Sequence, residues 1–313
     1  MKKKEKETLD ALIFIDTNIL LDFYRIRKSN VSMKYLEEIE NHLDLIITSS
    51  QVEMEFKKNR QSVILESISE IKKIGNTTGN IPTILSDSKA VEMIQKAQNE
   101  IQEKQKKLKE RIEKILKNPI YHDPVYKSLD KLFNHKSDIN LNRENKNRDI
   151  IRGLAKKRFI LGYPPRKKSD NSIGDGVNWE WIVACAKKTS KHIILVTRDS
   201  DFGCTYDKDS YLDDWLQQEF KERINKKRKI ILTDKLSRAF QLVEIPVTEE
   251  MIEEENKIIK LSSDDYFSNP IGNSLKNINT DLNTSGWIKS MKHLQEIAKI
   301  YRLKGEEDNN IDK

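Results

Sequence analysis

Four short apolar runs constrain the fold of this chain more than any other feature. Each is rich in Ile, Leu and Val without regular alternation: ALIFID (11–16), DLIITS (44–49), HIILVT (192–197) and KIILTD (229–234). This pattern is typical of strands buried on both faces, which occur in parallel sheets covered by helices. Helical patterns lie between the runs, at 31–43, 49–74, 174–189 and around 211–227. The sequence therefore predicts an open parallel α/β sheet with helices on both faces.

The segment between the second and third runs is far too long for one crossover helix. A seven-residue apolar repeat runs through it, formed by Ile94, Ile101, Leu108 and Ile115. A second apolar stripe precedes it, formed by Ile64, Ile68, Ile71 and Ile74. Both patterns indicate long helices, so we expect a helical arm that turns near 74–82. The predicted organisation is a sheet domain (1–60 and 150–235), an arm followed by a polar loop (61–149), and a C-terminal helical extension (236–313).

Composition narrows the class of protein and its partners. The 57 basic and 50 acidic residues give a formal net charge of +7, with local basic patches at 57–60, 104–111, 155–158 and 164–168. Nucleic acid is the expected partner of such patches, although the lysines at 104–111 alternate with glutamates and are expected to form a solvated helix face. No apolar run approaches the ~20 residues of a membrane span. Cys185 and Cys204 lack any CxxC spacing, so two free thiols in a reducing cytoplasm are expected.

Acidic side chains follow the predicted strands where ligands bind in open α/β sheets. Asp16 ends the first strand, and Asp199 and Asp201 follow the third. Glu53 and Glu55 lie in the helix after the second strand, and Asp175 begins the helix before the third. At ~4 Å, two carboxylates repel by about 4 kcal/mol at an effective dielectric constant of 20. Carboxylates without His or Cys suit Mg²⁺ or Mn²⁺, so the sequence predicts a site for such a cation.

Four motifs in order resemble the PIN-domain nucleases: FIDTN, QVEMEF, GDGVNWEWI and VTRDSDF. The bacterial PIN-like subgroup with PPRK before the GD-x-x-NWE helix is the most similar, through YPPRKKSDNSIGDGVNWEW. This resemblance implies a Rossmann-like three-layer fold and a phosphodiesterase that uses one or two Mg²⁺ or Mn²⁺ ions. The catalytic metal ligands that it implies are Asp16, Glu55, Asp175 and Asp199. Asn18 and Thr197 are expected to orient these carboxylates, and Asn178 could hydrogen-bond Asp175.

Two of the ligand assignments have alternatives. Glu53 and Glu55 cannot share a helix face, and the family pattern, not the periodicity, favours Glu55. Asp199 is nearest the strand end, and Asp201 is a candidate second ligand. We expect phosphate contacts from basic residues close to the site, namely Arg60, Arg166, Lys167, Lys168 and Arg198. Asp22, one turn into the helix after Asp16, is expected to be an ordinary surface residue.

The functional hypotheses follow from these assignments. The first is a metal-dependent endoribonuclease acting on single-stranded or structured RNA, with a role as a toxin or phage-defence effector. The alternatives are a catalytically inactive RNA-binding or scaffold protein, a structure-specific DNA nuclease, and a phosphatase with a strand-end aspartate. The phosphatase is disfavoured because the motif it needs has a second aspartate where this chain has Asn18. Candidate partners besides nucleic acid are an inhibitor or antitoxin and a second copy bound through the arm, with no membrane.

Overall fold

The computed structural model describes residues 9–73, 84, 88–166, 172–207 and 209–268. The chain divides into two units, 1–258 and 259–313, and the fold described below is that of the first. The predicted turn near 74–82 lies outside the described residues, as does the part of the C-terminal extension beyond Ser268.

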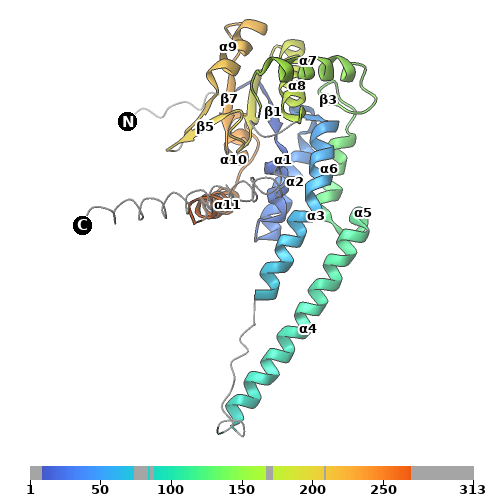
Figure 1. Ribbon diagram of the computed structural model, residues 1–313, viewed down its shortest axis with the longest axis vertical. Helices are drawn as coiled ribbons and strands as arrows, with labels where there is room; N and C mark the ends of the chain where they lie inside the picture. Colours follow the sequence, from blue (N-terminus) through green and yellow to red (C-terminus); the bar gives the residue numbers. More distant parts are fainter. Residues whose placement is uncertain (1–8, 74–83, 85–87, 167–171, 208, 269–313) are drawn as a thin grey trace, which may run out of the picture. The chain divides into compact units, whose positions relative to one another are not determined.

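Five parallel strands form the central sheet, in the order β3-β2-β1-β4-β7 (Figure 1). Their bounds are β1 (Ala11–Ile15), β2 (Ile46–Ser49), β3 (Asn140–Leu141), β4 (His192–Val196) and β7 (Ile230–Thr233). In the middle of the sheet Ile13 pairs with both Ile46 and Ile194, and all three side chains are buried. The four predicted strands and their parallel arrangement are confirmed. The edge strand β3 falls in the polar segment that was expected to be a loop.

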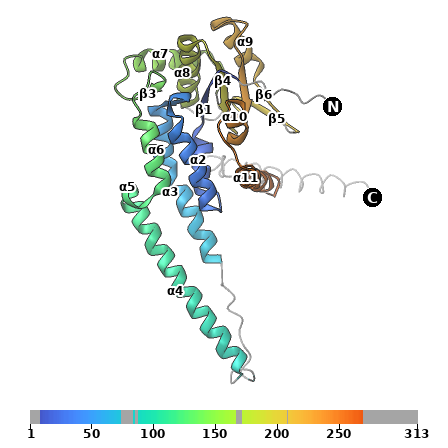
Figure 2. The ribbon, with the colours of Figure 1, turned by 180° about the vertical axis from the view of Figure 1, so that it is seen from behind.

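Helices cover both faces of the sheet and complete three layers (Figures 1 and 2). One face carries α2 (Ser29–Asn41), α6 (Pro124–Asn134) and α10 (Leu236–Leu242), and the rings of Tyr35 and Phe240 lie 6.0 Å apart between α2 and α10. The return crossover to β4 places α8 (Gly174–Thr189) on the opposite face. Its neighbours there are α7 (Arg148–Leu161) and α9 (Asp214–Arg223). Trp179 of α8 has no exposed surface and is part of the core.

A small antiparallel hairpin follows β4 and was not predicted. It consists of β5 (Gly203–Tyr206) and β6 (Asp209–Leu212), and most of its side chains are exposed. Because it is not buried, its sequence lacks the apolar run that marked the other strands. The helix expected from residue 211 therefore begins later, at α9, where the Asp213 carboxylate caps it by accepting bonds from the backbone N–H groups of Trp215 and Leu216.

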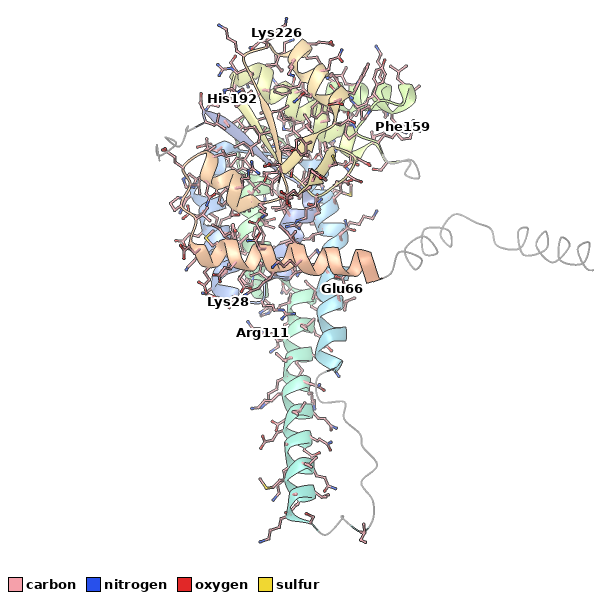
Figure 3. All side chains as sticks on the ribbon, turned by 90° about the vertical axis from the view of Figure 1, so that its left-hand side faces the viewer. Lys28, Glu66, Arg111, Phe159, His192 and Lys226 are labelled. Carbon is pink, nitrogen blue, oxygen red and sulfur yellow. The ribbon has the colours of Figure 1, made fainter. Side chains whose placement is uncertain are left out.

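The arm begins as a continuation of a core helix. The first half of α3 (Ser50–Lys73) packs in the sheet domain, and α4 (Lys89–Lys117) runs beside its second half, as Glu66 on α3 and Arg111 on α4 show (Figure 3). After α5 (Pro119–His122) the chain re-enters the core, because Leu129 of α6 and Leu141 of β3 are fully buried. The range predicted as arm and loop is therefore divided: its last part, from α6 onward, belongs to the sheet domain.

Short elements complete the first unit: α1 (Thr17–Leu21) and the 3₁₀ turns η1 (Asp22–Tyr24) and η2 (Leu43–Leu45). The last helix, α11 (Glu249–Ser268), packs against α2 at its start, where the Tyr35 hydroxyl donates to the Met251 carbonyl. Among the described helices, none has the length and apolar content needed to cross a bilayer.

Candidate metal centre

Asp16 stands between the end of β1 and the first turn of α1, and three donors fix its carboxylate. Oδ1 accepts the Thr17 backbone N–H at 2.6 Å, which makes Asp16 the N-cap of α1. Oδ2 accepts from the side-chain amide of Asn18 at 2.8 Å and from the hydroxyl of Thr197. Asn18 and Thr197 thus have the geometry of orienting residues, as expected from the sequence.

The electrostatic setting of Asp16 is unfavourable for a negative charge. The pKa of the Asp16 carboxyl is raised from 3.8 to about 6, chiefly by burial; the nearby carboxylates of Glu55 and Asp199 also raise it, and the hydrogen bonds from Thr197 and Thr17 lower it. The hydrogen bonds therefore do not fully replace the lost hydration. A cation in this place would supply the missing stabilisation.

Glu55 reaches the same region from the second turn of α3. Its Oε2 accepts from the Thr17 hydroxyl at 3.1 Å, and its Oε1 accepts from the Gln51 side chain at 2.7 Å. Glu53 instead forms an ion pair with Lys57 at 2.7 Å. The structure therefore brings Glu55, and not Glu53, toward Asp16. Gln51 was not singled out from the sequence, although its position four residues before Glu55 places the two on one helix face.

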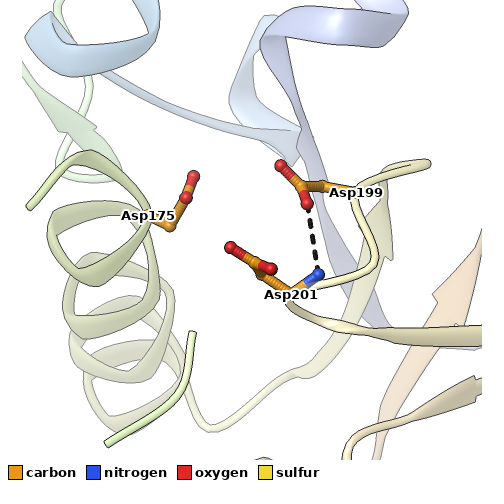
Figure 4. A group of neighbouring side chains, drawn as sticks. All are labelled: Asp175, Asp199 and Asp201. Atoms are coloured by element: carbon orange, nitrogen blue, oxygen red, sulfur yellow. Dashed lines mark hydrogen bonds between the residues drawn. The ribbon is translucent and has the colours of Figure 1, made fainter. Parts of the chain in front are cut away.

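Asp175, Asp199 and Asp201 form a tight acidic trio (Figure 4). One oxygen of each lies within 4.8 Å of the others, with Asp175 in the first turn of α8 and the two others in the loop after β4. The loop is held by two backbone bonds, from the Asp199 N–H to the Thr197 hydroxyl at 2.9 Å and from the Asp201 N–H to Asp199 Oδ1 at 3.1 Å. Both alternatives for the fourth motif thus lie beside Asp175.

Asp16, Glu55, Asp175 and Asp199 line one cavity of about 330 Å³. The rest of its lining consists of Thr17, Asn18, Leu21, Gln51, Met54, Lys58, Asn59 and Ser172. Neither His nor Cys occurs in this lining, and the ring of His192 instead accepts a bond from the Lys229 N–H at the far end of β4 (Figure 3). Mg²⁺ binds oxygen ligands at ~2.1 Å in octahedral geometry, so carboxylates this close together fit Mg²⁺ or Mn²⁺.

Among the described residues, the basic side chain that lines this cavity is not the one expected. Arg60 is 3% exposed, and its guanidinium forms an ion pair with Asp123 at 2.6 Å and also bonds the Tyr24 hydroxyl. This burial corrects the prediction that Arg60 contacts nucleic acid. Lys58 is exposed and lines the cavity. Its place three residues after Glu55 on the same helix face was the signal that could have identified it.

The other basic residues that were expected to contact phosphate lie in different environments. Arg198 pairs with Asp22, so Asp22 is a buried ion-pair partner and not the surface residue expected from the sequence. Arg166 is exposed, and its guanidinium lies over the Phe159 ring at 4.5 Å from the centroid. Lys167 and Lys168 lie outside the described residues. Asn178 is buried and accepts from the Ser49 hydroxyl at 3.1 Å, which ties α8 to the end of β2.

Comparison with known proteins agrees with this geometry. A sequence model of the PIN domain matches residues 13–202, a span that runs from β1 through the acidic loop after β4 and covers more than half of the chain. PIN domains are generally metal-dependent nucleases. No curated protein and no solved structure matches the chain. On the strength of the family match, this chain belongs to the PIN-domain family.

Proposed function

We propose that this protein is a metal-dependent endoribonuclease that cuts single-stranded or structured RNA. The observation that carries the proposal is the convergence of Asp16, Glu55, Asp175 and Asp199 on one cavity at the carboxyl edge of the sheet. These acids come from four separate segments of the chain, so their meeting is a product of the fold.

In this proposal the acidic residues have different roles. Asp175, Asp199 and Asp201 would hold one divalent cation, and Asp16 and Glu55 line the same cavity as Asp175 and Asp199. A bound cation of this kind activates water as a nucleophile and neutralises charge on the phosphate. Asn18 and Thr197 keep Asp16 in the orientation that binding requires, and Gln51 does the same for Glu55.

Positive charge supports a phosphodiester substrate. Lys58 on α3 is exposed and lines the acidic cavity, and Arg166, which lies over the Phe159 ring outside this lining, is also exposed. Cations at these places would attract a polyanion toward a cavity whose own acidic charge would otherwise repel it. The preference for RNA over DNA rests on the family resemblance. Comparing RNA and DNA substrates tests this preference.

The experiment is cleavage of labelled single-stranded RNA in Mg²⁺ or Mn²⁺, with single-stranded DNA and duplex RNA in parallel. We expect cleavage of RNA that chelation of the metal abolishes. Glu55→Gln and Asp175→Asn should lower the rate by at least ~100-fold, whereas the matched variant Glu53→Gln should cleave normally. Full activity in Asp175→Asn protein would contradict the proposal. RNA binding without metal uptake or cleavage would favour the non-catalytic alternative.

A toxin or phage-defence role belongs to the same proposal. An unrestrained endoribonuclease depletes cellular RNA, so expression of the protein should arrest growth. Asp199→Asn should relieve the arrest at equal protein level. Equal arrest by both proteins would separate any toxicity from the nuclease site.

A further inference from the structure

Two exposed aromatic side chains form a pair outside the acidic cavity. The ring of Tyr163, which follows α7, and the indole of Trp215, in the first turn of α9, have centroids 5.3 Å apart at an interplanar angle of 36°. Tyr163 is 40% exposed and Trp215 is 46% exposed. Aromatic surface left in solvent in this way can still accept a flat ring as a stacking partner.

Contacts between α8 and α9 place this pair at the level of the acidic trio. The Trp179 indole N–H donates to Glu219 at 3.3 Å, and Arg223 pairs with Glu180 at 2.7 Å, so residue numbers rise together along the two helices. One turn earlier on each helix stand Asp175 and Trp215. The backbone gives the same placement, because the Asp213 N–H donates at 2.9 Å to the carbonyl of Phe202, the residue after Asp201.

A buried ion-pair network holds the pair in place. Arg158, which is 4% exposed, donates to Glu180 at 2.9 Å and also to Glu219 of α9. The same guanidinium donates to the Pro164 carbonyl, directly after Tyr163. One side chain therefore connects the segment that carries Tyr163 to the helix that carries Trp215. Rings fixed in this way lose little conformational entropy on binding a ligand.

Positive charge lies next to the pair. Arg166, three residues after Tyr163, is exposed over the ring of Phe159, a residue that Figure 3 labels near the end of α7. Of the two acids that precede Trp215, Asp213 is occupied as the cap of α9, and Asp214 is exposed in the first turn of that helix. A strand whose base lay on the aromatic pair could thus place a backbone phosphate near a cation.

We propose that Tyr163 and Trp215 form a stacking platform for an unpaired base of the RNA strand whose phosphodiester lies at the acidic cavity. This inference rests on the proposed nuclease function for its substrate class. Bases of a duplex are already stacked and paired, so the platform selects single-stranded segments. Trp179, the aromatic that shares its helix side with Asp175, cannot serve this purpose because it has no exposed surface.

The test measures binding of a labelled short oligouridine to the full chain carrying Asp199→Asn, which keeps the strand uncut. Stacking contributes ~1–3 kcal/mol per base, so Trp215→Ala should weaken binding by about 5- to 150-fold, and Tyr163→Ala should weaken it within the same range. Trp215→Phe should restore most of the affinity. Tyr121→Ala removes an aromatic on α5 that is even more exposed, and this protein should bind as the parent does.

Two further substrates make the result specific. Trp215→Ala should weaken binding of single-stranded DNA by the same factor, since the platform does not contact the sugar. It should leave the weaker binding of duplex RNA unchanged. Normal oligouridine binding by both Trp215→Ala and Tyr163→Ala proteins, with unchanged melting temperatures, would overturn the platform, as would equal losses for duplex RNA. A platform-dependent affinity in a protein that never cuts RNA would uphold this inference while the nuclease proposal fails.

Discussion

Thr197, the residue after β4, donates its hydroxyl to the carboxylate of Asp16, the residue after the neighbouring strand β1. The same hydroxyl accepts the backbone N–H of Asp199 at 2.9 Å. One small side chain therefore connects two of the acidic residues, although Thr197 and Asp16 are 181 positions apart in the chain. Parallel strands with adjacent carboxyl ends make this contact possible.

Replacing Thr197 by Val should weaken metal binding without changing the shape of the site. Val keeps the β-branched form but removes the donor to Asp16 and the acceptor for Asp199. We expect a loss of Mn²⁺ affinity of ~10–100-fold by isothermal titration calorimetry. The matched control is Thr233→Val on β7, since Thr233 pairs with Val196 in the sheet but lies outside the acidic cavity. Equal losses for both variants would show a general effect on the sheet.

Asp199→Asn should stabilise the protein when no metal is bound. The trio repels itself without a cation, so removing one charge should add about 1 kcal/mol and raise the melting temperature by ~2–4 °C. Mn²⁺ should raise the melting temperature of wild type more than that of the variant, because the variant has lost a ligand. Asp207→Asn, at an exposed hairpin residue with φ 56°, serves as the control and should show neither effect.

Metal binding should weaken on acidification because of the raised pKa of Asp16, which is about 6. Below that pKa a proton occupies the carboxylate, so Mn²⁺ affinity should fall as pH drops through about 6. Stability of the metal-free protein should respond in the opposite sense. Since the folded pKa exceeds the unfolded one, stability should fall as pH rises from about 4 to about 6, and the loss should be on the order of 3 kcal/mol at neutral pH.

The protonation of Asp16 can also be followed through the thermal stability of the metal-free protein. Melting curves of metal-free wild type and Asp16→Asn should converge as pH falls from about 6 to about 4, because the variant lacks the group that protonates. A constant difference between the two proteins from neutral to acidic pH would show that Asp16 is not the responsible group.

Two basic residues of α3 should behave in opposite ways. Arg60→Met leaves Asp123 buried without its partner, so urea unfolding should show a loss of ~3–5 kcal/mol. Lys58→Met should change stability by less than ~0.5 kcal/mol, because Lys58 is exposed. It should instead weaken RNA binding and reduce the salt dependence by about one charge. Comparable destabilisation by both variants would contradict the assigned roles.

The sheet and most of the acidic site could be predicted because their signals are local. An apolar run without alternation identifies a buried strand, and its last residue identifies the carboxyl edge. Asp16 and Asp199 follow directly from that rule. Glu55 and Asp175 lie on helices, and their placement needed the family resemblance as well as the pattern.

The remaining features depend on partners far away in the chain. Arg60 is buried because Asp123, 63 positions later, returns to meet it, and Asp22 is buried because Arg198 does the same from 176 positions away. The strand β3 has two residues, too few for any periodic signal. Trp215 follows an exposed hairpin whose sequence resembles a loop. In each case tertiary contacts, and not local propensity, decide the outcome.

The buried ion pair of Arg60 and Asp123 also bears on how much the length of the arm can change. The chain leaves the sheet domain after Arg60 and re-enters it at Asp123. The ion pair between these two residues therefore connects the two ends of the arm. The entropy of closing a loop changes slowly with its length. The arm is therefore a module that evolution or an engineer can shorten, lengthen or exchange. Shortened arms that preserve Arg60 and Asp123 should melt as cooperatively as the parent.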